Sequence, residues 1–157
     1  MEKTSLKLSE FLQLDAELNG VVNQQTGEVV SKGLIAEIKK LTTKYWLSDL
    51  AKKVAVEKES VEKFKNELIQ KHGEADPSGN ISIPLYINEV TNEEGVVVSR
   101  ELNPKFVEFQ NEFGALLEET RDLEHKEFKI EEFESVELSD DNEASYNVFF
   151  KLIKVGE

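Results

Sequence analysis

Two apolar stripes at helical spacing dominate the pattern of hydrophobic and polar positions along the chain. The first stripe, interrupted by Glu57, consists of Leu47, Leu50, Val54, Val61, Phe64 and Leu68. The second consists of Phe106, Phe109, Phe113 and Leu116. Steps of three and four residues place each set on one face of a helix. Because apolar faces avoid water, the pattern predicts that the two stripes pack together and form the core.

Signals at the ends of both helices agree with this prediction. The first helix is expected to begin near Thr42 or Thr43 and to end at His72-Gly73, a usual pair at a helix C-terminus. For the second helix, Asn103 is a good N-cap and Pro104 suits the first helical position. The sequence therefore predicts an antiparallel helical hairpin, 43–72 against 103–119.

The segment between the two helices has the alternation and turn residues of a β insert. Residues 76–79 form a turn signal, and residues 80–87 alternate like a strand that Pro84 restricts to a sheet edge. A second turn at 93–95 precedes a second strand at 96–98. These two strands are expected to pair as a hairpin.

The N-terminal flank predicts a short helix over 6–18, with Ser9 as a candidate cap. The residues expected on its inner face are Leu8, Phe11, Leu12 and Leu18. Residues 21–30 are compatible with a small hairpin or with an ordered loop.

An apolar run at 34–41 then has helical spacing. In the C-terminal third, residues 122–130 predict a strand, and Phe133, Val136 and Leu138 are expected to point inward. Residues 146–155 form a closing apolar segment that is either helix or strand.

The fold class that follows is α+β: an antiparallel helical hairpin with a small antiparallel sheet formed by the insert and the C-terminal third. The length of 157 residues fits a single domain over 1–157. Its expected parts are 1–42, an N-terminal helix with a hairpin or loop; 43–119, the helical hairpin with its insert; and 120–157, an acidic tail.

Charge is unevenly distributed along the chain, whose net charge is −13. Residues 1–72 carry 12 basic and 11 acidic side chains, whereas residues 73–157 carry 7 and 21. A negative surface disfavours direct binding to nucleic acid or to anionic lipid. No stretch has the apolar length of a membrane span, and the N-terminus lacks the pattern of a signal peptide.

Motifs for catalysis or cofactor binding are not found. There is no phosphate-binding glycine loop, no nucleophile elbow and no cysteine, and a structural role is expected for both histidines, His72 and His125. The alternation of Asp76, Ser78 and Asn80 lacks the rest of a calcium loop and is interpreted as a turn. We therefore expect no enzyme, no cofactor and no metal site.

The densest acidic stretch is the candidate partner contact. Its chosen residues are Glu131, Glu132, Glu134, Glu137, Asp140 and Asp141. A carboxylate run this dense is usually a solvated face, and the alternative is a surface that meets a basic partner.

The end of the first helix carries a distinctive run of residues: Leu68, Ile69, Lys71, Gly73, Glu74, Asp76, Gly79 and Asn80. These positions match a Leu-x-x-Lys-Tyr-Gly-Glu-x-Asp-x-x-Gly-Asn turn, and His72 stands where Tyr is usual. In this turn the chain resembles a set of small tailed-bacteriophage proteins of unassigned function, in which a long helix ends in the same way. The resemblance implies a phage origin and a fold, and it carries over no activity and no site residues.

Taken together, the sequence favours a non-enzymatic bacteriophage protein that acts through protein–protein contacts, as a virion-associated structural or assembly component. The alternative is an acidic anti-defence inhibitor that mimics DNA or blocks a basic host surface. The expected partners are other phage structural proteins, a basic host protein or a second copy of the chain. The expected location is the virion or the host cytoplasm.

Overall fold

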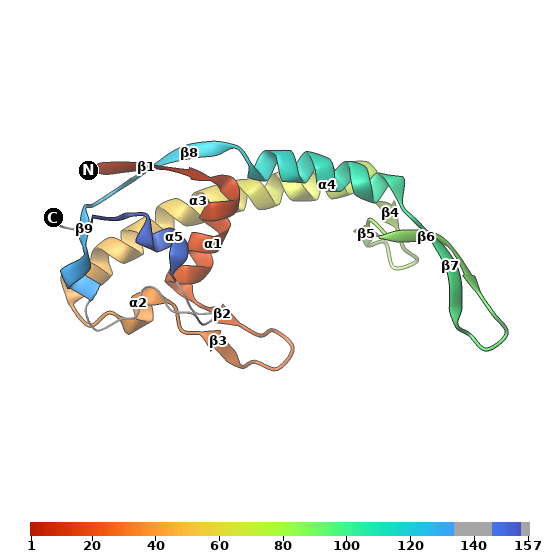
Figure 1. The fold of residues 1–157 in the computed structure, drawn as a ribbon, viewed down its shortest axis with the longest axis horizontal. Coiled ribbons are helices and arrows are strands. Elements are labelled where there is room, and N and C mark those ends of the chain that lie inside the picture. The colour runs from red at the N-terminus through yellow and green to blue at the C-terminus, as the bar shows by residue number, and fades with distance from the viewer. Residues whose placement is uncertain (134–145, 155–157) are drawn as a thin grey trace. The chain divides into compact units, whose positions relative to one another are not determined.

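The computed structural model describes residues 1–133 and 146–154 (Figure 1). These residues combine a long helix with small, mostly antiparallel sheets, so the predicted α+β class is confirmed at this level. The chain forms two compact units. Unit 1 comprises Met1–Glu59 and Glu119–Glu157, and unit 2 comprises Ser60–Glu118.

Unit 1 gathers both ends of the described chain. Its elements are β1 (Glu2–Lys7), α1 (Leu8–Asn19), β2 (Val21–Val22), β3 (Val29–Ser31), α2 (Leu34–Glu37), the first part of α3 (Leu41–His72), β8 (Thr120–His125), β9 (Phe128–Lys129), the 3-10 helix η1 (Ile130–Phe133), α5 (Asn147–Phe150) and β10 (Ile153–Lys154). The predicted long helix is confirmed as α3. Of the two structures left open for 21–30, the hairpin is found.

The strand β1 was not predicted, because its partner lies far away in the sequence. It pairs antiparallel with β8, with Glu2 opposite His125 and Lys7 opposite Thr120 (Figure 1). The helix α1 consequently begins at Leu8, and Ser9 lies inside it. The N-cap is Lys7, whose backbone N–H donates to the carboxylate of Glu10 at 3.0 Å.

The prediction of one small sheet formed by the insert and the C-terminal third is wrong: among the described residues, no strand of the insert pairs with a strand of the C-terminal third. Instead, β8 pairs with the N-terminal β1, and β6 (Tyr86–Thr91) pairs with β7 (Val97–Leu102) inside the insert. The closing segment 146–155, left open as helix or strand, contains both α5 and β10. β10 pairs with β9 in parallel.

The core lies in unit 1. The largest fully buried side chains are Phe11, Phe128, Phe133, Phe149, Leu6, Leu14, Leu18, Leu34, Leu47, Leu50 and Val54. Three of them, Phe128, Phe133 and Phe149, contact one another with ring centroids 5.2–6.1 Å apart. Leu12, expected on the inner face of its helix, is only half-buried. Phe133, Val136 and Leu138 were also expected to point inward; Phe133 is buried, and Val136 and Leu138 lie outside the described residues.

Unit 2 contains the remainder of α3, β4 (Glu74–Ala75), β5 (Ile81–Ser82), β6, β7 and α4 (Pro104–Leu117). The predicted strand over 80–87 is in fact two strands. Its first part, β5, pairs with β4 around the confirmed turn, where the Asp76 side chain accepts from the backbone N–H groups of Ser78 and Asn80. Its second part, β6, pairs with β7. Pro84 lies between them and has no N–H for a ladder.

Burial corrects the prediction that the two apolar stripes form the core. The first stripe is buried at Leu47, Leu50, Val54 and Val61, but Phe64 is 50% exposed. No residue of α4 is buried, and the apolar side chains of its stripe are only half-buried. The first stripe therefore contributes to the core of unit 1, and the second stripe keeps part of its surface in water.

Candidate functional site

The predicted contact residues lie only partly in the described chain. Glu131 and Glu132 belong to η1, and Glu134, Glu137, Asp140 and Asp141 lie outside the described residues. Glu131 is exposed. Glu132 holds the local fold, because its carboxylate accepts from the Thr43 hydroxyl at 3.2 Å and from the backbone N–H of Lys129 at 3.0 Å.

The two histidines make different contacts. His125 is buried, with Nε2 2.8 Å from the Thr4 hydroxyl and Nδ1 2.8 Å from the backbone carbonyl of Lys126. Its ring also stacks on Phe128. The hydrogen bond between the side chains of His125 and Thr4 thereby adds to the backbone pairing of β8 with β1.

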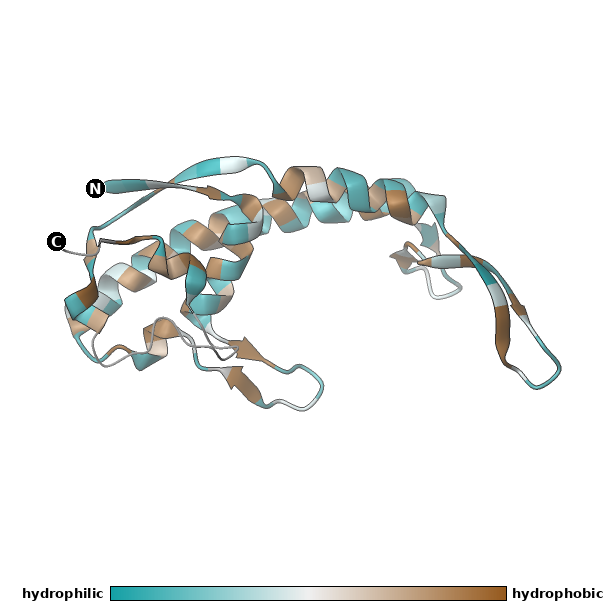
Figure 2. Cartoon of the chain, viewed as in Figure 1, coloured by the Kyte–Doolittle hydropathy of each residue, from teal (hydrophilic) through white to brown (hydrophobic). Residues whose placement is uncertain are grey.

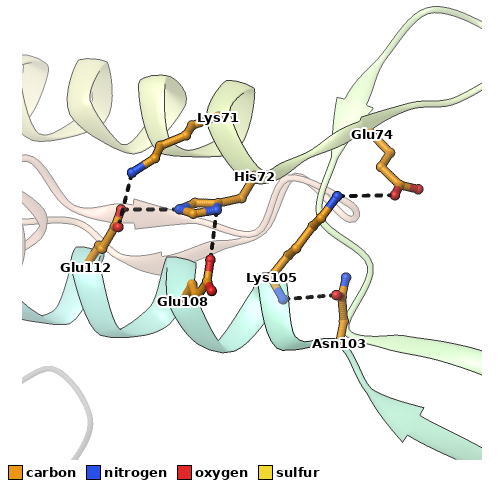
Figure 3. A network of polar contacts seen from close by, with 7 residues as sticks. All are labelled: Lys71, His72, Glu74, Asn103, Lys105, Glu108 and Glu112. Carbon is orange, nitrogen blue, oxygen red and sulfur yellow. Dashed lines mark hydrogen bonds and ion pairs between the residues drawn. The ribbon is translucent and has the colours of Figure 1, made fainter.

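His72, the last residue of α3, lies at the centre of a polar network in unit 2 (Figure 3). Its Nε2 is 3.3 Å from Oε2 of Glu112, and its Nδ1 is 3.5 Å from Oε2 of Glu108. Lys71 reaches Oε1 of Glu112 at 3.3 Å. The hydrogen bond from His72, and then that from Lys71, lowers the pKa of the Glu112 carboxyl.

A second set of polar contacts fixes the start of α4 (Figure 3). The side chain of Asn103 accepts from the backbone N–H of Lys105 at 3.1 Å, which confirms the predicted N-cap. The amide nitrogen of Asn103 donates to the carbonyl of Pro84 at 2.8 Å. Lys105 approaches the carboxylate of Glu74 at 3.7 Å. These contacts tie the β insert to α4.

The residues in Figure 3 form ion pairs and hydrogen bonds that hold the end of α3 and the insert against α4. They supply carboxylates, one imidazole, ammonium groups and an amide, with no hydroxyl or thiol nucleophile. Among the described residues, no group of three or more His, Cys, Asp or Glu is arranged to hold a metal ion.

Apolar side chains of unit 2 are the other notable feature, because nearly all of them remain accessible. Residues 60–118 are all described, and Val61 is the one hydrophobic side chain among them that is buried. Large hydrophobic side chains of unit 2 that are more than two-fifths exposed are Phe64, Leu85, Val90, Val96, Val97, Val98 and Leu102. Figure 2 shows hydrophobic positions on both β6 and β7.

Three phenylalanines form a ladder along α4. The rings of Phe106 and Phe109 have centroids 6.2 Å apart, and those of Phe109 and Phe113 are stacked at 5.7 Å. The ammonium group of Lys65, on α3, lies 5.8 Å from the centroid of Phe113. The rings of the ladder thus belong to α4 and are half-buried, and α3 places a lysine over one of them.

Sequence reasoning missed a buried carboxylate, Glu17, in unit 1. Its oxygens accept from the backbone N–H groups of Phe149 at 2.9 Å and Val148 at 3.2 Å. Burial is the main cause that raises the pKa of the Glu17 carboxyl, and the two N–H groups partly oppose this shift. A single Glu on the inner side of an amphipathic helix was the available signal, but its partners lie over 130 residues away.

Comparisons with known proteins give no relative from which a role could be transferred: no protein-family model, curated protein or solved structure matches the chain. Within the described residues, no helix has the length and apolar character needed to cross a membrane.

Proposed function

We propose that the protein is non-enzymatic and acts through protein–protein contacts, with unit 2 as its contact region. This proposal rests on how few apolar side chains are buried in Ser60–Glu118: Val61 is the single buried hydrophobic side chain of that segment. Amphipathic helices and strands normally cover their apolar faces. A partner surface would supply the cover that unit 2 lacks.

The helical hairpin enters the proposal as the scaffold of this contact region. The C-terminal turns of α3 and the helix α4 are joined by Lys71–Glu112 and by His72 with Glu108 and Glu112. These polar contacts fix the two helices, while the phenylalanine ladder of α4 stays half-buried. Full burial of one large apolar side chain contributes about 1.5–3 kcal/mol, so several half-buried rings give a partner a useful source of binding energy.

The biological setting is proposed from the resemblance to small tailed-bacteriophage proteins. In that setting the chain is a virion-associated structural or assembly component, located in the virion or in the host cytoplasm. A scaffold with accessible apolar edges and no catalytic constellation among its described residues suits such a role.

Mass spectrometry of purified phage particles tests the proposed setting, and variants of unit 2 test the contact region. We expect the chain to co-purify with particles or with an assembly intermediate. Replacement of Phe64 by Gln should weaken this association, since Phe64 is 50% exposed. Val56→Gln is the matched control, because Val56 is 61% exposed on the same helix but belongs to unit 1.

Two results would contradict the proposal. Equal association of the Phe64 and Val56 variants would remove unit 2 from the contact. A chain that is absent from particles and competes with DNA for a basic host protein would instead support the acidic inhibitor. That competition should weaken steeply with salt.

A further inference from the structure

The first turns of α3 expose two large apolar side chains in a basic setting. Leu41 is 79% exposed, and Tyr45, one helical turn later, is 64% exposed. Residues 38–48 contain three lysines and no acidic residue, in a chain whose net charge is −13. All three lysines are exposed. We call this surface the α3 patch, and it consists of Lys39, Lys40, Leu41, Lys44 and Tyr45.

The stability of the helix does not explain the lysines of the α3 patch. The first turn of α3 contains no acidic residue, although negative charge is favourable at a helix N-terminus and positive charge opposes the helix dipole. No ion pair between described residues includes any of these three lysines. The Glu132 carboxylate reaches this turn only through Thr43, which is 1% exposed and thus lies on the buried side of the helix. The three ammonium groups are therefore available to carboxylates of a partner.

The aromatic member of the α3 patch is supported by its neighbours. The ring of Tyr45 meets that of Trp46 edge-on, with centroids 5.2 Å apart. The ammonium group of Lys126 lies 5.4 Å from the centroid of the Trp46 ring and adds a further cation beside the patch. An exposed ring that is already held loses little side-chain entropy on contact, and tyrosines are enriched among the residues that dominate binding energy.

The hairpin β6–β7 of unit 2 combines exposed apolar side chains with the opposite charge. Residues 88–102 are all exposed. The large apolar side chains among them are Val90, Val96, Val97, Val98 and Leu102. The charged side chains are one arginine, Arg100, and four acids, Glu89, Glu93, Glu94 and Glu101. The arginine is already used within the hairpin, since its guanidinium lies 3.7 Å from the centroid of the Tyr86 ring.

The other exposed hairpin of the chain lacks this excess of acid. The strands β2 and β3 also expose valines, including Val29 at 61% and Val30 at 57%. The charges around them, Glu28 and Lys32, balance. Charge complementarity therefore selects β6–β7, and not β2–β3, as the surface that matches the α3 patch.

We infer that the α3 patch of one copy of the chain binds the hairpin β6–β7 of a second copy. Leu41 and Tyr45 would cover valines of the hairpin, and the lysines would meet its glutamates. At an ionic strength of about 0.15 M the Debye length is about 8 Å, so repulsion between distant charges of two acidic copies is largely screened, while opposite charges in contact still attract. The inference rests on the proposed contact role of unit 2 and names its partner.

The two surfaces differ, so the contact is head-to-tail. Each copy in such a pair keeps one unused patch or hairpin, to which a further copy can bind. Contacts of this kind produce rings when the rotation between copies closes and filaments when it does not. Either product suits the structural or assembly component proposed above.

The test uses two charge-reversed variants of the full chain. Lys40→Glu with Lys44→Glu reverses the α3 patch, and Glu93→Lys with Glu94→Lys reverses the hairpin. In sedimentation velocity from low to high micromolar concentration, the wild type should assemble, and each variant alone should need at least about tenfold more protein. An equimolar mixture of the two variants should assemble like the wild type, because each surface then finds one of opposite charge. This recovery also shows that both variants are folded.

Control variants separate local contact from net charge. Lys52→Glu with Lys63→Glu makes the same change in net charge at exposed positions further along α3, and it should assemble like the wild type. Leu41→Gln should weaken assembly about tenfold, because it removes an apolar side chain from the contact. Its matched control is Val56→Gln, on the same helix and 61% exposed, which should have no effect.

Four results would overturn the inference: a wild type that stays monomeric, assembly that survives either reversal, a mixture that does not recover assembly, or an equal loss in the Lys52 and Lys63 control. The proposed function is tested separately, because co-purification with particles and the Phe64 variant report contacts with other proteins. Loss of self-assembly with particle association intact would refute only the inference drawn from the α3 patch.

Discussion

The buried carboxylate of Glu17 leads to the sharpest prediction about stability. Glu17 is 7% exposed and accepts two backbone N–H groups at the start of α5. Replacement by Ala would leave the N–H groups of Val148 and Phe149 without this acceptor. Each buried donor without a partner costs about 1–3 kcal/mol, and relief from burying a carboxylate offsets part of the total. We expect Glu17→Ala to lower the free energy of unfolding by about 2–4 kcal/mol.

Urea unfolding followed by tryptophan fluorescence measures the change in unfolding free energy of unit 1, the unit that contains Glu17. The single tryptophan, Trp46, lies in the unit 1 part of α3 and is half-buried. Hydrogen exchange provides a local readout, because the amides of Val148 and Phe149 should exchange faster in the variant.

The pH dependence has a defined sign. The folded-state pKa of Glu17 is raised above the ordinary value of 4.5, mainly by burial, so the folded state binds the proton more tightly than the unfolded state. The stability that protonation of Glu17 provides is fully present below pH 4.5 and is lost as the pH rises through the raised pKa. Glu17→Gln cannot ionise, so the difference between its stability and that of the wild type should change with pH in this window.

Glu10→Gln is the control for Glu17. Glu10 also contacts the C-terminal segment, through an ion pair with Lys151. The hydrogen bond from Lys151 is the first cause that lowers the pKa of Glu10, so its contribution is lost as the pH falls. A surface pair of this kind contributes at most about 1 kcal/mol. An unchanged urea midpoint and unchanged exchange for Glu17→Ala would refute the assignment of Glu17 as the residue that holds α5.

Three further predictions follow from burial, backbone and charge. Phe149→Ala should cost about 3–5 kcal/mol in urea unfolding, whereas Phe109→Ala should cost roughly half as much because its ring is half-buried; equal costs would contradict the position of the core. Gly33→Ala should cost more than about 2 kcal/mol by the same measurement, because φ is +86° and an added Cβ would meet backbone atoms at the end of α1; a wild-type midpoint would exclude this strain. Glu112→Gln should remove a stabilisation that is present above the ordinary Glu pKa of 4.5 and is lost as the pH falls through the Glu112 pKa, which His72 lowers. If the urea midpoints of the wild type and of Glu112→Gln stay parallel from about pH 3 to 7, the pairing of Glu112 with His72 would be refuted.

Local patterns in the sequence determined the elements whose partners are close along the chain. The periodicity of the first stripe predicted α3, and Asn103-Pro104 predicted the start of α4. The turn at 76–79 depends on the short-range bonds of the Asp76 side chain, so it was also predictable. In each case the stabilising contact lies within a few residues.

The tertiary structure decided where apolar surface is buried and which distant segments pair. Stripe spacing shows that a face is apolar, but burial depends on what the fold places against that face. The unit 1 part of α3 lies in a unit with α1 and α5, whereas α4 keeps its stripe half-exposed. The pairing of β1 with β8 and the bond between Glu17 and the start of α5 join residues over 100 positions apart, and no local periodicity specifies such partners.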